Sequence, residues 1–148
     1  MARRIEPSRK RPLEVLADVL SGHREANIAG PVQARKYLER VLVENKSIPN
    51  ATKFFLYDLL AEACHATGEE ARAREAVDLA RQYVDDAREE APREWKEHLP
   101  ELRFLEISIA LASDEGRFEE ALADCETALK WGLGKAYEAK ATSLRRMI

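Results

Sequence analysis

Residues 54–84 read FFLYDLLAEACHATGEEARAREAVDLARQYV, and this stretch decides the fold. Its apolar and small residues recur every three or four positions on both sides of Gly68, a spacing that places them on one face of a helix. Gly68 stands where a helix ends in a positive φ angle, which glycine adopts without strain. The stretch therefore predicts two helices, over about 52–67 and 69–90, joined by a tight turn.

A second stretch, around Gly116, repeats this pattern. A small residue follows each glycine five positions later, Ala73 and Ala121, and an aromatic residue closes each second helix, Tyr83 and Trp131. Small residues let two antiparallel helices approach closely, while bulky residues fill the remaining space. The repetition predicts a second antiparallel helix pair of the same kind.

The composition also favours helices. The chain has 148 residues, of which 23 are Ala and 17 are Leu, and aromatic residues make up 7%. This length suits one domain or a short repeat array, and no segment shows the alternation of a strand. No apolar run approaches 18 residues, so we expect no membrane span. We expect an all-α fold of about seven helices, over residues 12–26, 31–45, 52–67, 69–90, 101–113, 117–131 and 135–148.

These helix pairs resemble the tetratricopeptide repeat. The signature of that family has an aromatic residue, Leu and a small residue in the first helix, then Gly, then Ala-x3-Phe-x2-Ala in the second. Residues 54–84 carry it well, residues 101–131 carry it with one extra residue before the glycine, and residues 13–45 carry only its second half. The resemblance implies a short right-handed solenoid over residues 12–148, with residues 135–148 as a capping helix.

The spacing of the units departs from the family. Ala34, Ala73 and Ala121 hold equivalent places but lie 39 and 48 residues apart, whereas the family repeat has about 34 residues. About 14 extra residues therefore fall near 85–100, and the proline that usually closes each unit is missing. A looser, repeat-like helical bundle remains open as the alternative.

The resemblance also implies a binding groove lined by the first helix of each unit. The matching positions are Phe55, Asp58, Glu62, His65, Leu102, Leu105, Ile109 and Ala112. Some family members clamp a carboxylate with Lys, Arg and Asn at such places, but acidic and apolar residues stand there in this chain. We therefore expect no such clamp, and a non-catalytic scaffold or adaptor that binds a peptide or a partner subunit, within a larger assembly or alone.

Two segments allow two interpretations each. Apolar residues cover the expected helix 101–113 nearly all round, which predicts burial by neighbouring helices, by a partner helix or by a second copy of the chain. In the partner interpretation, glutamates at positions 105 and 109 abolish binding and leave helicity intact. The acidic insert 85–100 is a solvated face or a docking patch for a basic partner, including the chain's own basic arm. Trp95 within it either anchors an interface or packs the insert onto the array.

No motif for catalysis, a metal ion or a cofactor is visible. His23, His65 and His98 are isolated in sequence, and no Gly-rich phosphate loop occurs. Cys64 and His65 are adjacent, so their side chains diverge by about 100° on a helix and do not form a nucleophile–base pair. Without a visible secretory signal, Cys64 and Cys125 are expected to be buried free thiols. We expect a cytoplasmic protein that is not an enzyme and needs no cofactor.

The basic arm at residues 1–11 supports a second hypothesis. Its cations are Arg3, Arg4, Arg9, Lys10 and Arg11. Such an arm can neutralise phosphates, which suits a nucleic-acid-associated subunit with Arg145 and Arg146 as further contacts. The acidic middle of the chain argues against a continuous basic track, and the plainer interpretation is a solvated terminus. Self-association through a terminal helix or the helix 101–113 is a third possibility.

Overall fold

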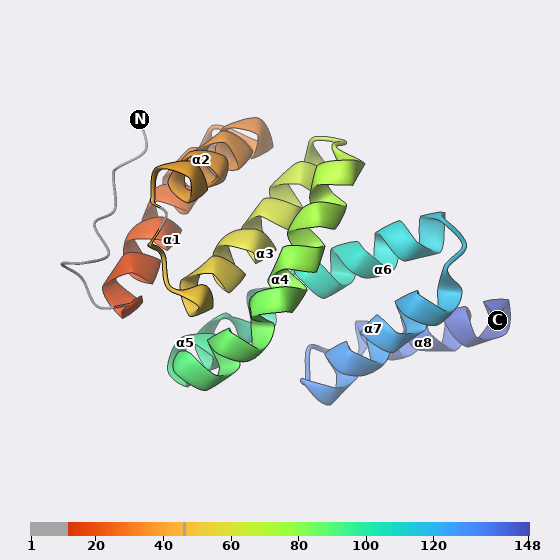
Figure 1. Ribbon diagram of the computed structural model, residues 1–148. Coiled ribbons are helices and arrows are strands. Elements are labelled where there is room, and N and C mark those ends of the chain that lie inside the picture. The colour runs from red at the N-terminus through yellow and green to blue at the C-terminus, as the bar shows by residue number, and fades with distance from the viewer. Residues whose placement is uncertain (1–11, 46) are drawn as a thin grey trace.

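A computed structural model describes residues 12–45 and 47–148, and this part of the chain is helical and contains no strand. The all-α class is thereby confirmed. The helix pairs α1/α2, α3/α4 and α6/α7 follow one another in a row that runs from α1 at one end to α8 at the other (Figure 1). The helices are α1 (Pro12–Ile28), α2 (Pro31–Glu44), α3 (Asn50–Ala66), α4 (Glu70–Glu90), α5 (Pro92–His98), α6 (Phe104–Asp114), α7 (Phe118–Lys130) and α8 (Ala136–Met147), with a 3-10 turn at Leu99–Glu101.

The described residues hold eight α-helices rather than seven, and α6 begins later than expected. The additional helix is α5, which starts at a proline, a residue suited to the first turn of a helix. The sequence predicts a helix from Glu101, but Leu102 is extended, with φ −63° and ψ 136°. The reason lies in α3, where Asp58 Oδ1 accepts hydrogen bonds from the backbone N–H groups of Arg103 at 2.9 Å and Phe104 at 2.8 Å. These bonds fix the start of α6 at Phe104 because they satisfy amides that have no partner within the helix.

The turns after α3 and α6 close in the same way. Gly68 and Gly116 have φ angles of 75° and 76°. The next backbone N–H donates to a carbonyl five residues earlier, from Glu69 to Cys64 at 2.9 Å and from Arg117 to Ala112 at 2.8 Å. This closure satisfies carbonyls at the helix end and sends the chain back along the preceding helix. The glycine signals of the sequence therefore correspond to real turns between paired helices.

Each helix pair also contacts the next pair along the row. Helix α2 packs on α3, α4 packs on α6, and α7 packs on α8. The first helices are neighbours too, because α3 contacts both α1 and α6. Between the second and third pairs, Arg81 of α4 holds Asp124 of α7 through two bonds of 2.8 and 3.0 Å, and Ser108 of α6 donates to the same carboxylate. The polar network thus joins three helices of two pairs.

The acidic insert packs onto the core through Ala87, Ala91 and Trp95, while none of its acidic side chains is buried. Trp95 of α5 is 8% exposed and packs against Phe54 of α3 and edge-on against Trp131 at the end of α7, with centroid separations of 5.6 and 5.1 Å. The guanidinium of Arg88 lies 5.7 Å from the Trp95 ring centroid and 5.5 Å from that of Trp131. Of the two interpretations of Trp95, its burial supports packing onto the array, because little of the ring remains for a partner.

Candidate partner-binding groove

Helices α1, α3, α6 and α8 share one hollowed face, which we call the groove. Its large pocket has a volume of about 870 Å³ and is lined by residues of α3, α6 and α8 together with Arg103, which directly precedes α6. Its small pocket has a volume of about 390 Å³ and is lined by residues of α1, α3 and the segment 98–103. Glu62 and Arg103 line both pockets, so the two hollows adjoin at these residues.

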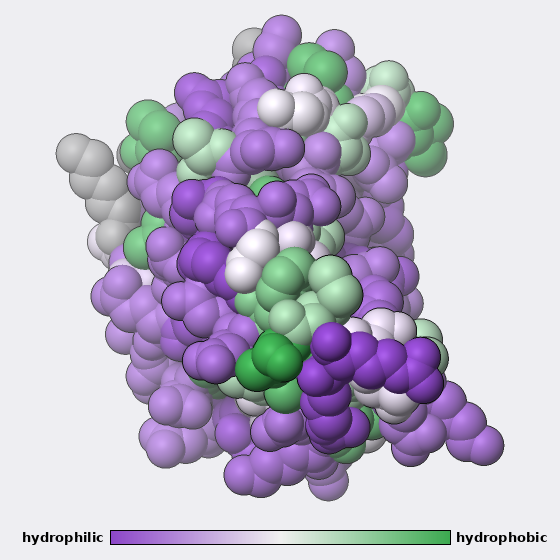
Figure 2. Space-filling view, turned by 90° about the vertical axis from the view of Figure 1, so that its right-hand side faces the viewer, coloured by the Kyte–Doolittle hydropathy of each residue, from purple (hydrophilic) through white to green (hydrophobic). Residues whose placement is uncertain are grey.

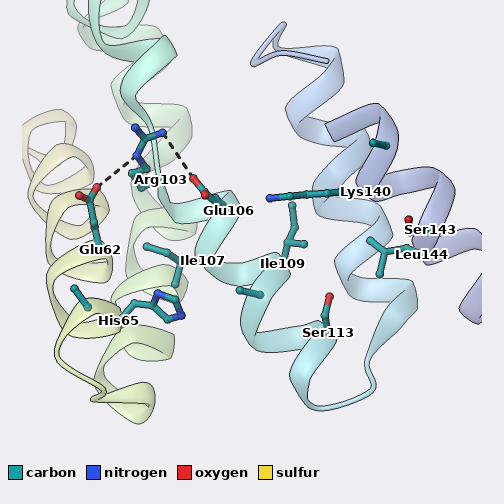
Figure 3. A pocket seen from close by; sticks show the side chains of 13 residues that line it. Glu62, His65, Arg103, Glu106, Ile107, Ile109, Ser113, Lys140, Ser143 and Leu144 are labelled. Atoms are coloured by element: carbon teal, nitrogen blue, oxygen red, sulfur yellow. Dashed lines mark ion pairs between the residues drawn. The ribbon is translucent and has the colours of Figure 1, made fainter. Parts of the chain in front are cut away.

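The large pocket has an apolar floor and a polar rim. Ile107, Ile109 and Leu144 supply the floor, and all three are buried against the core. The side chain of Arg103 lies 3.6 Å from Glu62 and 3.7 Å from Glu106 (Figure 3). These three side chains are each about half exposed, so the ion pairs are weak and can be exchanged for others.

The α8 side of the large pocket carries a positive charge, that of Lys140. Lys140 reaches from α8 toward α6 (Figure 3), and its Nζ lies 5.3 Å from the ring centroid of Tyr137. Among the described residues, no carboxylate forms an ion pair with Lys140. Ser113 and Ser143 add hydroxyl groups to this side of the pocket. The pocket therefore combines an apolar base, an arginine between two glutamates, and a lysine that has no anionic partner among the residues the structure describes.

The small pocket contains a buried carboxyl group. Asp58 is 3% exposed, and its Oδ1 caps α6 as described above. Burial raises the pKa of Asp58 from 3.8 to about 7, although the two backbone hydrogen bonds act in the opposite direction. Its position is explained by the cap, which is a structural role. His98 also lines this pocket, with its ring edge-on to that of Phe55 at a centroid separation of 5.6 Å.

The structure brings together most of the residues predicted to line a groove. Phe55, Asp58, Glu62 and Leu102 line the small pocket, and Glu62, His65 and Ile109 line the large pocket. Only Glu62 and His65 are exposed, however, because the others are also packed into the core.

Two predicted residues do not line the groove. Leu105 is 2% exposed and belongs to the core, and Ala112 lies on a separate hollow between α4, α6 and α7. The apolar residues of α6 are therefore covered by neighbouring helices of the same chain. Of the interpretations of the helix 101–113, the structure supports this one over burial by a partner helix or a second copy. Glutamates at positions 105 and 109 are consequently expected to disrupt folding. The partner interpretation had predicted instead that they abolish binding and leave the helicity intact.

Several groove residues escaped the sequence-based reasoning. From α8 these are Lys140, Ser143 and Leu144, and from the other segments they are His23, Arg24, His98, Arg103 and Glu106. The spacing of Lys140 and Leu144, four residues apart, places them on one helix face and is a signal that was available. No pattern in the sequence indicates that α5 and the 3-10 turn line the groove, because this depends on how the insert folds back onto the helix pairs.

Other features of the chain can be placed as well. Both cysteines are buried, and burial raises the pKa of the Cys64 thiol to about 11 and that of Cys125 above its usual value. The residues that the structure describes contain no cluster of three or more His, Cys, Asp or Glu side chains arranged for a metal ion. Within the same residues, no helix is both long and apolar enough to cross a membrane.

The residues proposed for phosphate contacts fall into two groups. Arg3, Arg4, Arg9, Lys10 and Arg11 lie outside the described residues. Arg145 and Arg146 are exposed in the last turn of α8. The molecule seen from the α8 end of the row is mostly hydrophilic, with a small apolar area near the middle of the view (Figure 2).

Comparison with known proteins gives no relative. No family model, no curated protein and no solved structure matches the chain.

Proposed function

We propose that this chain is a non-catalytic interaction scaffold that binds a segment of a partner protein in the groove. In this proposal the pairs α1/α2, α3/α4 and α6/α7 are units of a short, right-handed, tetratricopeptide-like solenoid, and α8 is its capping helix. The single observation that supports the proposal is the sharing of one hollowed face by α1, α3, α6 and α8, the first helix of each unit and the cap.

The chemistry of the large pocket suits a protein segment. The alanines of its lining, Ala66, Ala110 and Ala139, offer apolar contact area, and its half-exposed charges offer exchangeable ion pairs at the rim. Ala66 and Ala139 lie on its walls as exposed small residues, so nothing bulky blocks access from α3 or α8.

Exposed alanines supply a matched test. We expect Ala66→Tyr with Ala139→Tyr to fill the pocket and to reduce recovery of partner proteins from native-source extract at least tenfold. The control is Ala71→Tyr with Ala136→Tyr, which makes the same change at exposed positions outside both pockets. Both variants should keep the thermal unfolding temperature of the parent. Equal recovery by the two folded variants would contradict a groove-bound partner.

The nucleic-acid hypothesis makes a different prediction for the same extract. If Arg3, Arg4, Arg9, Lys10 and Arg11 mediate association, recovery depends on nucleic acid and falls steeply with salt concentration. Nuclease treatment and deletion of residues 2–11 then remove the partners, whereas the alanine-to-tyrosine variants do not.

A further inference from the structure

Three arginines of α4 recur at intervals of seven residues, and we call this row the arginine ladder. Its members are Arg74, Arg81 and Arg88. Seven residues make almost two full turns of an α-helix, so the three side chains start from one face of α4. At the ordinary rise of a helix the row extends over about 21 Å, close to the length of α7.

The first two arginines of the ladder bind carboxylates of the third helix pair, α6/α7. Arg74 forms an ion pair with Glu115, which lies in the turn between α6 and α7. Arg81 holds Asp124 in the middle of α7 through the two bonds of 2.8 and 3.0 Å. Asp124 is 5% exposed, so its carboxylate depends on Arg81 and on the hydroxyl of Ser108 for compensation.

The third arginine of the ladder contacts aromatic rings. The guanidinium of Arg88 lies over both Trp95 of α5 and Trp131, which directly follows α7. Contacts of this kind attract a cation to the faces of the rings. The ladder therefore connects α4 to the beginning, the middle and the end of α7.

The junction between the first and second pairs has only the first step of such a ladder. Arg35 of α2 follows a close-packed alanine as Arg74 does, and its Nε lies 3.1 Å from Glu69 beside the turn after α3. Seven residues after Arg35 stands Leu42, which packs against apolar neighbours. The complete ladder thus occurs at the junction where the insert 85–100 separates two pairs in sequence.

Helix α6 links the ladder to the groove, because it has one face toward each. Ser108 and Ala112 line a hollow together with Arg74 and Arg81 on the α4 side. Glu106, Ala110 and Ser113, in contrast, line the large pocket of the groove. The opposite walls of that pocket belong to α3 of the second pair and to α8, which packs on α7.

We propose that the arginine ladder sets the angle between the second and third helix pairs and thereby the width of the large pocket. The Asp58 cap fixes the start of α6, and the ladder holds α7 at its two ends and its middle. The ladder arginines are positioning residues, because none of the three lines either pocket of the groove. The inference goes beyond the proposed function, since this angle is measurable without a partner.

Pulsed electron paramagnetic resonance between two nitroxide labels measures the width of the pocket. The labels are attached to cysteines that replace the exposed Ala66 of α3 and Ala139 of α8, in a chain whose Cys64 and Cys125 are replaced by alanine. In the ladder variant, glutamine replaces Arg74, Arg81 and Arg88. We expect its distance distribution to be about twofold wider than that of the parent, because the third pair is then free to turn about the start of α6.

Two further variants make the result specific. The control carries glutamine at three exposed arginines outside the ladder, Arg40, Arg93 and Arg146, and should keep the distribution of the parent. Since the ladder variant leaves the buried Asp124 without a cation, a second ladder variant adds Asp124→Asn, and it should widen the distribution as well. Thermal unfolding confirms that each variant is folded.

Two results would overturn the proposal. A lower thermal unfolding temperature with an unchanged distribution in the folded ladder variants would mean that the ladder adds stability only. Equal widening in the ladder variants and the control would mean that the loss of charge acts wherever it occurs. Neither result bears on the proposed function, which the tyrosine variants at Ala66 and Ala139 test separately.

Discussion

Asp58 provides the most quantitative prediction, because its carboxyl group is buried and caps α6. A group whose pKa is higher in the folded chain than in the unfolded chain binds its proton more tightly when folded. The pKa of Asp58 is 3.8 in the unfolded chain and about 7 in the folded chain. Its contribution to the free energy of unfolding is therefore greatest at low pH and falls as the pH rises between these two values. Between pH 5 and pH 8 the expected loss is about 2–3 kcal/mol.

Two substitutions separate the cap from the charge. Asp58→Asn keeps an oxygen that accepts from the N–H groups of Arg103 and Phe104 but removes the titration. Asp58→Ala removes the acceptor at every pH, and we expect it to cost about 1–3 kcal/mol because two amides lose their partner.

The assay is urea unfolding followed by the fluorescence of Trp95 and Trp131, at pH 5 and at pH 8. The account predicts that the free energy of unfolding of Asp58→Asn gains about 2–3 kcal/mol relative to the parent between pH 5 and pH 8. A constant difference between parent and Asn variant would refute the reasoning. It would mean that the two backbone hydrogen bonds outweigh burial and keep the carboxylate ionised.

Three further predictions concern groups that the fold buries. Leu105→Glu with Ile109→Glu should abolish cooperative unfolding, because both side chains are buried in the core. Circular dichroism during heating would show this loss. An intact unfolding transition would instead mean that this face of α6 is open to a partner. Trp95→Ala should lower the free energy of unfolding by about 3–5 kcal/mol, whereas a loss below 1 kcal/mol would place the ring outside the core. Cys64 and Cys125 should resist iodoacetamide at pH 8 until urea unfolds the chain, because burial raises both thiol pKa values. Labelling is measured by mass spectrometry, and labelling of the folded chain would contradict the burial of the thiols.

The helix pairs were predictable because their signals are local. Gly68 and Gly116 end helices where their neighbours can satisfy the last carbonyls, and the spacing of Ala73 and Ala121 marks the close approach within each pair. Each of these signals depends on residues within one helix or one turn. A short window of sequence therefore carries them.

The groove was predictable only in part. Glu62, His65 and Ile109 follow from helical spacing, but Asp58 fits both a groove and a cap until the position of Arg103 is known. The grouping of His23, His65 and His98 depends on how α1, α3 and α5 pack, which no local pattern encodes. The insert was the hardest part, because the contact of Trp95 with Trp131 joins segments that only the tertiary fold brings together.

The central claim is that a partner segment lies in the groove, and site-specific photo-crosslinking tests it most directly. A benzoylphenylalanine at position 139 replaces an exposed alanine on the wall of the large pocket, and the same residue at position 71 is the matched exposed control on α4. The account predicts that irradiation in native-source cells joins the chain to one partner polypeptide from position 139 and not from position 71. Crosslinks to that partner from position 71 and none from position 139 would contradict it.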